Sequence, residues 1–120
     1  MTLKGLDISH WNAIDWPTWA GNGYRFVYIK ATEGTTWVDD KWELHKTGAE
    51  ASDFYTGPYH YFRAAWNGAE QARHFHNIAG GQTWDMPPAV DVEIINNTGF
   101  TKEVFAARLR ACLLEVERLF

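Results

Sequence analysis

The sequence has one cysteine, few prolines and no long hydrophobic run. Because Cys112 is the only cysteine, no intrachain disulfide can form, and burial of apolar surface must hold the fold together. No stretch reaches the apolar length that spans a bilayer, so we expect no membrane insertion. Residues 1–8 also lack the apolar segment of a signal peptide. These absences predict a domain that folds around its own hydrophobic core.

Basic residues are few and nowhere clustered. The chain has 11 Lys and Arg against 15 Asp and Glu, which gives a formal net charge of −4. Without a basic run there is little attraction for phosphates, so we expect no nucleic-acid partner. No glycine-rich segment has the spacing of a phosphate-binding loop, which predicts no nucleotide cofactor. His74 and His76 are two residues apart on a predicted helix, which does not suit a zinc pair, so we expect no metal site.

Aromatic residues are plentiful by contrast. Phe, Trp and Tyr make up 16% of the 120 residues. So much ring surface either fills a core or lines a site for flat apolar ligand faces, such as those of sugar rings. The apolar fraction of 46% and the charged fraction of 22% are close to globular averages, so we predict a single folded domain over residues 1–120.

Short runs rich in β-forming residues alternate with stretches of helical period. The predicted strands are residues 4–9, 25–31, 54–62 and 89–95, and the predicted helices begin near Asp15, Asp39, Asn67 and Thr101. The alternation is typical of parallel βα repeats, so we expect an α/β fold with about four βα units. Because a closed barrel needs about eight strands, the sheet is either open and doubly wound or part of an incomplete barrel. Cys112 falls on the apolar stripe of the last helix and is predicted to be buried.

Two carboxylates stand two residues apart in the fourth predicted strand. Side chains alternate across a strand, so Asp91 and Glu93 should point to the same side. The apolar residues on both sides, up to Ile94 and Ile95, indicate a buried strand. Like charges held close raise the pKa of one, which leaves a protonated acid beside an ionised carboxylate, as glycosidic bond cleavage requires. The alternative is an ordinary strand that exposes its acids to solvent.

The other predicted strands also end in polar or aromatic residues. Asp7 ends the first strand, either as a site residue or as a turn or helix cap. Glu33 follows the second, where it could bind ligand hydroxyls or pair with Lys30, and Tyr59 and Tyr61 end the third. Ligands of α/β folds bind at the carboxyl ends of the strands. Because every predicted strand has polar or aromatic residues at that end, we expect a site there.

Five segments, in this order along the chain, carry a family resemblance: LDISHWN at 6–12, IDW at 14–16, FVYIKATEG at 26–34, GPYHYF at 57–62 and PAVDVE at 88–93. They resemble the motifs of the glycoside hydrolase family 25 lysozymes. The resemblance implies an irregular β/α barrel that hydrolyses the β-1,4 bond between N-acetylmuramic acid and N-acetylglucosamine in peptidoglycan. It implies Glu93 as the general acid, with Asp91 and Asp7 as its acidic partners, and it implies no cofactor.

The resemblance also places Asp39 and Tyr59 near the site, and together with Glu33 and Tyr61 we expect them to bind substrate. A family 25 domain is longer than this chain, so its C-terminal strands are expected to be missing here. A second polypeptide or a second copy would then complete the barrel. The alternatives are a peptidoglycan-binding or structural virion protein without the full catalytic set, and a truncated fragment.

A cell-wall substrate and the lack of a signal peptide together predict a phage origin. Such a protein would be an endolysin held in the host cytoplasm before release, or a part of the virion.

Overall fold

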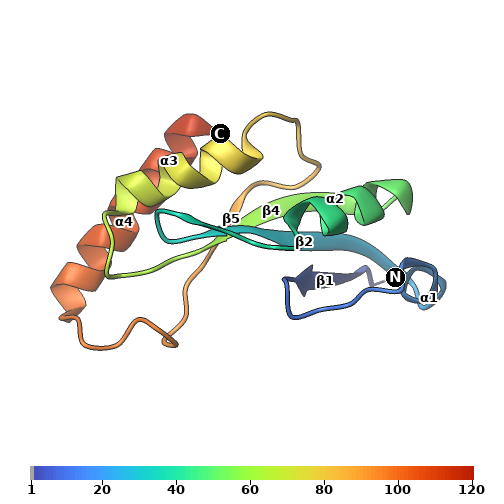
Figure 1. Ribbon diagram of the computed structural model, residues 1–120, viewed down its shortest axis with the longest axis horizontal. Coiled ribbons are helices and arrows are strands. Elements are labelled where there is room, and N and C mark those ends of the chain that lie inside the picture. The colour runs from blue at the N-terminus through green and yellow to red at the C-terminus, as the bar shows by residue number, and fades with distance from the viewer. Residues whose placement is uncertain (1) are drawn as a thin grey trace.

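The computed structural model describes residues 2–120 as alternating strands and helices. In chain order the elements are β1 (Lys4–Ile8), α1 (Trp16–Gly21), β2 (Tyr24–Glu33), β3 (Trp37–Val38), α2 (Trp42–Ala51), β4 (Tyr55–Tyr61), α3 (Gly68–Ala79), β5 (Ala89–Asp91) and α4 (Lys102–Leu119) (Figure 1). The strands form one sheet in the order β1-β2-β4-β5, and every neighbouring pair in that order is parallel. The predicted α/β class is confirmed. Within residues 2–120 the sheet does not close, so it forms an incomplete barrel.

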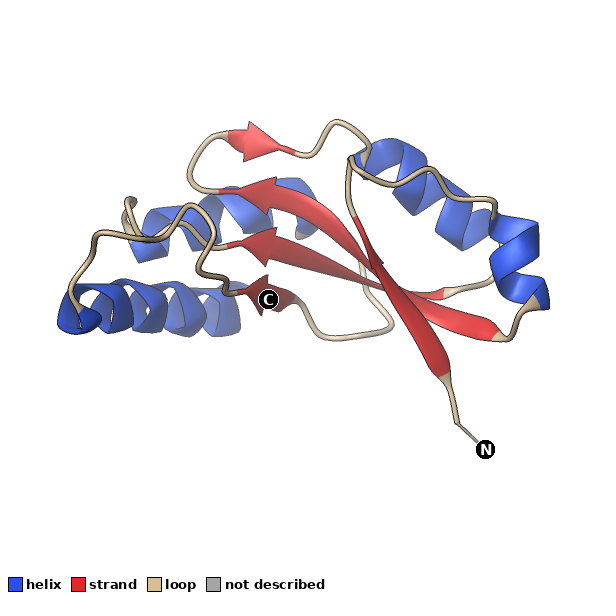
Figure 2. Ribbon diagram, turned by 90° about the horizontal axis from the view of Figure 1, so that it is seen from below, coloured by secondary structure: helices blue, strands red, loops and turns tan. Residues whose placement is uncertain are grey.

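The hydrophobic core lies between the sheet and its helices. In two views at right angles, α3 and α4 lie side by side at one end of the molecule, while α1 and α2 lie toward the other (Figures 1 and 2). β2 is central and rich in β-branched and aromatic residues, which favours a strand that is buried on both faces. Fully buried side chains from β2, from the residue that follows β4, and from α3 and α4 meet in this core: Val27, Ile29, Ala31, Phe62, Phe75 and Cys112. The predicted burial of Cys112 is confirmed.

The fourth predicted strand is shorter than expected. β5 ends at Asp91, whereas the sequence predicted a strand that continues to Ile95. Ile94 is 80% exposed and Ile95 is 67% exposed, so the prediction that this apolar run is buried was wrong. The physical reason is that β5 pairs only with β4 within the described residues, and the chain leaves the sheet after Asp91 to form a loop.

Two smaller differences lie between β2 and α2. The chain turns at Gly34, which has a positive φ of 59°, and β3 pairs back antiparallel with the end of β2. A strand of two residues is too short to leave a periodic signal in the sequence. α2 begins at Trp42 and not near Asp39, because Asp39 accepts hydrogen bonds in the turn that precedes the helix.

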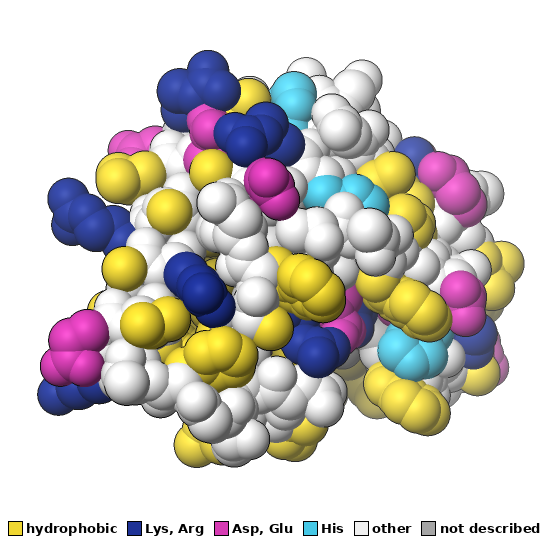
Figure 3. Space-filling view, turned by 60° about the vertical axis from the view of Figure 1, so that its left-hand side comes forward, with side chains coloured by type: hydrophobic (Ala, Val, Ile, Leu, Met, Phe, Trp, Pro, Cys, Tyr) yellow, Lys and Arg dark blue, Asp and Glu magenta, His cyan; other side chains and the backbone are white. Residues whose placement is uncertain are grey.

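The surface mixes charged and apolar side chains. On the face shown in Figure 3, acidic, basic and hydrophobic side chains are interspersed. Across residues 2–120 there is no helix with both the length and the apolar character needed to cross a membrane.

Candidate active site

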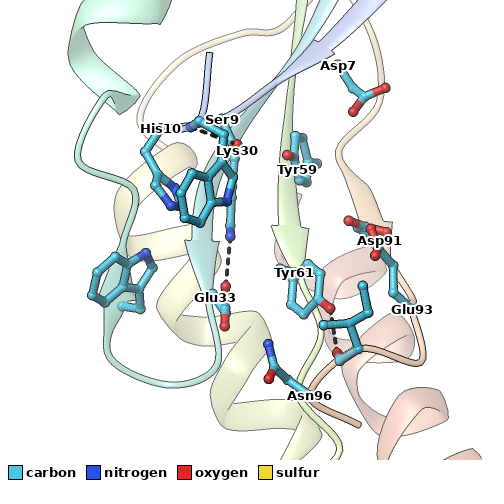
Figure 4. Close-up of a pocket in the computed structure, with 13 residues that line it drawn as sticks. Asp7, Ser9, His10, Lys30, Glu33, Tyr59, Tyr61, Asp91, Glu93 and Asn96 are labelled. Carbon is cyan, nitrogen blue, oxygen red and sulfur yellow. Dashed lines mark hydrogen bonds and ion pairs between the residues drawn. The ribbon is translucent and has the colours of Figure 1, made fainter.

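A cleft of about 560 Å³ opens at the carboxyl ends of the parallel strands (Figure 4). β1, β2, β4 and β5 each contribute side chains to it, as expected for a site in a fold of this type. The structure brings most of the predicted site residues together here: Asp7, Glu33, Tyr59, Tyr61, Asp91 and Glu93. The exception among the predicted residues is Asp39, which does not line the cleft.

Asp91 and Glu93 lie together on one wall of the cleft (Figure 4). Asp91 is the last residue of β5 and is half-buried, whereas Glu93 lies beyond the strand and is exposed. Burial, a hydrogen bond with Glu93 and the negative charges of Glu93 and Asp7 raise the pKa of Asp91 to about 6. Asp91 therefore holds its proton at a pH where an ordinary aspartate has lost it. The sequence predicted that the pKa of one of two neighbouring carboxyl groups would be raised, and in the structure the raised pKa is that of Asp91.

The two tyrosines of β4 form the floor between the walls. Burial raises the pKa of the Tyr59 hydroxyl, and the nearby charges of Asp7 and Asp91 raise it further. Burial also raises the pKa of Tyr61, whose hydroxyl donates a 2.6 Å hydrogen bond to the carbonyl oxygen of Ile95. Both tyrosines thus stay neutral, and Tyr61 ties the exposed loop after β5 to the floor.

Glu33 is held by two basic side chains. Its carboxylate oxygens each accept a 2.7 Å ion-paired hydrogen bond, one from Lys30 Nζ and the other from an Arg63 guanidinium nitrogen. Burial by itself would raise the pKa of Glu33, but these bonds outweigh it and lower the pKa. The pairing with Lys30 considered from the sequence is present. Glu33 is therefore an ionised carboxylate in a fixed orientation at the edge of the cleft.

Asp39 lies behind the cleft wall and supports His10. Its side chain is fully buried and accepts hydrogen bonds from the His10 backbone N–H at 3.1 Å and from the ring Nδ1 at 2.9 Å. His10, Trp11 and Trp37 also line the cleft, and no role was predicted for them from the sequence. The signal for Trp11 was its position two residues after the first predicted strand, in the same segment as Asp7.

The described part of the chain, residues 2–120, contains no group of three or more His, Cys, Asp or Glu side chains arranged to hold a metal ion.

Comparison with known proteins gives a consistent result. The chain is 38% identical over 96 residues to lysozyme M1 of Streptomyces globisporus, in a match that covers 76% of this chain and 33% of the relative. It is 38% identical over 93 residues to the autolytic lysozyme of Clostridium acetobutylicum, in a match that covers 77% of this chain and 28% of that lysozyme. The chain thus spans about a third or less of the length of these two relatives.

Solved structures match the fold more fully. The muramidase from Acremonium alcalophilum superposes with a TM-score of 0.87 at 35% identity, covering 98% of this chain and 61% of the muramidase. A family GH25 lysozyme from Aspergillus fumigatus gives a TM-score of 0.86 at 30% identity, covering 95% of this chain and 59% of the lysozyme. Residues 6–119 match the family described as Glycosyl hydrolases family 25. The chain therefore belongs to glycosyl hydrolases family 25.

Proposed function

We propose that this chain carries the acid and base groups of a peptidoglycan hydrolase, a muramidase that cleaves the β-1,4 bond between N-acetylmuramic acid and N-acetylglucosamine. The observation that carries the proposal is the raised pKa of Asp91, about 6, beside Glu93 and Asp7 in an open cleft. Family membership and relatives named lysozyme and muramidase support the same chemistry.

In the proposed reaction, Glu93 delivers a proton to the glycosidic oxygen. Asp91 shares a hydrogen bond with Glu93, and Glu93 is the more exposed of the two, so the proton held by Asp91 can pass to substrate through Glu93. The bond from the anomeric carbon to that oxygen breaks, and its electron pair stays on the departing sugar. The carboxylates of Asp91 and Asp7 stabilise the positive charge that develops on the ring. Water then adds to the anomeric carbon and returns a proton to the carboxylate pair.

Tyr59, Tyr61 and Glu33 are proposed to contact the substrate. They line the floor and one edge of the cleft, and the tyrosine hydroxyls and the Glu33 carboxylate can bond to sugar hydroxyls. Asp39 is proposed to act through His10, because its own carboxylate is buried behind the wall.

We propose that further polypeptide, from a second chain or a second copy, completes the barrel of this domain. The support is that β1 and β5 each pair on one side only within residues 2–120, which leaves two strand edges available for pairing. The test is the molar mass of the purified protein by light scattering. A mass above one chain supports completion by a copy, and a monomer that hydrolyses peptidoglycan contradicts the proposal.

The place of action is proposed to be the bacterial cell wall, with a phage as the source. The support is the family, together with a likeness to the CTP1L endolysin at 27% identity and a TM-score of 0.65. Efficient signal-dependent secretion of the protein by its source cell would contradict the phage origin.

The hydrolysis itself is tested by the loss of turbidity of a peptidoglycan suspension. Glu93→Gln should reduce the rate by about 10²–10⁴-fold, the usual contribution of a general acid. Glu117→Gln, at an exposed position on α4, is the matched control and should leave the rate unchanged. Undiminished hydrolysis by folded Glu93→Gln would overturn the assignment. A folded chain that binds peptidoglycan without cleaving it would favour the binding or virion protein.

A further inference from the structure

Three ring side chains cluster at the edge of the cleft. The centroid of the His10 ring lies 4.5 Å from that of Trp11 and 6.4 Å from that of Trp37. Trp11 is 84% exposed and Trp37 is 47% exposed, although both indoles are large and apolar. Single exposed apolar residues are ordinary, but two indoles gathered at the edge of a polar cleft form a surface suited to a ligand.

Contacts behind the cluster hold His10 and the backbone of Trp37 in place. Asp39 fixes both the backbone and the ring of His10, and its carboxylate also accepts a 3.0 Å hydrogen bond from the Lys41 backbone N–H. On β3, the backbone carbonyl of Trp37 is 2.9 Å from His74 Nε2 of α3. The part of the surface that is already fixed loses little entropy when a ligand binds.

The cluster lies across the cleft from the acid pair. Figure 4 shows His10 on one side and Asp91 and Glu93 on the other, with Tyr59 and Tyr61 between them. The acidic wall would repel phosphates, which disfavours a nucleotide. A pyranose ring fits both sides, because it has an apolar face for an indole and hydroxyl groups for carboxylates and tyrosines.

The geometry points to an aromatic platform, formed by His10, Trp11 and Trp37, that binds one sugar residue of a glycan strand on the side of the cleft opposite Asp91 and Glu93. This inference rests on the proposed function for the class of ligand, a polymer of N-acetylated sugars. It assigns binding, and no bond-breaking step, to the platform.

Binding of the N-acetylglucosamine tetramer, measured by calorimetry, tests the platform. All proteins carry Glu93→Gln so that no turnover occurs. Trp11→Ala and Trp37→Ala should each raise Kd about tenfold, as expected when a ring contact is removed. Trp11→Phe should recover part of the affinity. Tyr55→Ala is the matched control, because Tyr55 is 60% exposed at the opposite end of β4 and should leave Kd unchanged.

The outcomes separate the platform from the hydrolysis. If the wild-type chain cleaves no peptidoglycan but tetramer binding depends on Trp11 and Trp37, the platform is supported while the proposed hydrolysis fails. If both alanine variants bind as tightly as their parent, the platform is overturned even where hydrolysis is intact. Absence of tetramer binding by the parent, or competition by a free stem peptide in place of the sugar, would also overturn it.

Discussion

The side-chain amide of Asn97 donates a 2.9 Å hydrogen bond to the backbone carbonyl oxygen of Glu93. The same nitrogen donates to the carbonyl of Phe62 at 2.9 Å, and the amide oxygen accepts from the Ala64 N–H at 2.7 Å. Asn97 is only 5% exposed, so these bonds join the loop after β5 to the chain beyond β4. The backbone of Glu93 is thus held in place by Asn97, although Glu93 lies outside the sheet.

Replacement of Asn97 should loosen this loop. Asn97→Ala removes a buried side chain that makes three hydrogen bonds, so we expect the free energy of unfolding to fall by about 2–4 kcal/mol. Urea unfolding followed by circular dichroism measures the change. Asn77→Ala, at an exposed position in α3, is the control and should have almost no effect. An unchanged unfolding midpoint in Asn97→Ala would show that the loop is held by other contacts.

Asp91→Asn should stabilise the fold at neutral pH while it abolishes hydrolysis. The folded pKa of Asp91, about 6, lies above its ordinary value of 3.8, so the folded state binds this proton more tightly than the unfolded state. The contribution of Asp91 to wild-type stability therefore falls as the pH rises from about 4 to 6, and an amide that never ionises avoids the loss. The variant and the wild type should unfold at similar urea concentrations at pH 4, and the variant at a higher one at pH 7.5. A variant that is less stable at pH 7.5 would contradict the raised pKa.

The sequence predicted that site residues from different strands meet in one cleft, because the patterns that indicate each strand lie within short segments of the chain. Strands of β-branched and aromatic residues alternate with helices, which predicts a parallel sheet. In a parallel sheet the carboxyl ends of all the strands lie at the same edge. The positions of Asp7, Tyr59 and Asp91 in the cleft could be predicted from this arrangement alone. Glu93 was expected to lie in the cleft because side chains alternate along a strand. In the structure it lies there because Asn97 holds the loop that follows β5.

Other features depend on contacts between residues far apart in the sequence. Asp39 was expected in the site, but it is buried against His10, which is 29 residues away along the chain. Exposure of Ile94 depends on what pairs with β5, which no periodicity within the run can reveal. The platform role of Trp37 depends on β3, which is two residues long. Tertiary context decided each of these positions.

Gly68 should not tolerate a side chain, because α3 meets α4 at this residue. A Cβ at Gly68 would lie 2.0 Å from the carbonyl oxygen of Arg108 and 2.8 Å from the backbone nitrogen of Cys112. Backbone atoms cannot move aside cheaply, so Gly68→Ala should push the helices apart and lower the melting temperature by several degrees, about the effect of 1–3 kcal/mol. Gly21→Ala is the matched control, since nothing lies within 4 Å of its Cβ position. Equal melting temperatures for the two variants would contradict the close approach.

A buried polar chain connects the sheet to α3. Gln71 donates from its side-chain nitrogen to the carbonyls of Arg63 and Trp66, which leaves its oxygen facing His60 Nε2 at 3.0 Å. The His60 Nε2–H therefore donates to Gln71, and Nδ1 accepts from the Thr32 hydroxyl at 2.7 Å. His60 is fully buried, and burial lowers its pKa to about 4 from an ordinary 6.5. The fold requires the neutral imidazole.

Acid should consequently destabilise the protein through His60. Between pH 6.5 and 4 the unfolded state takes up a proton that the folded state refuses, so this group removes on the order of 3 kcal/mol of stability as the pH falls. His60→Gln is less stable than wild type at pH 7, because it disturbs a buried network, but it does not titrate. The gap in unfolding free energy between wild type and His60→Gln should therefore narrow from pH 7 to pH 4, as measured by urea titrations at each pH. The effect of Asp91 has the opposite sign in much of the same range, so wild-type stability alone would mix the two. A gap that stays constant from pH 7 to pH 4 would show that His60 ionises equally in both states.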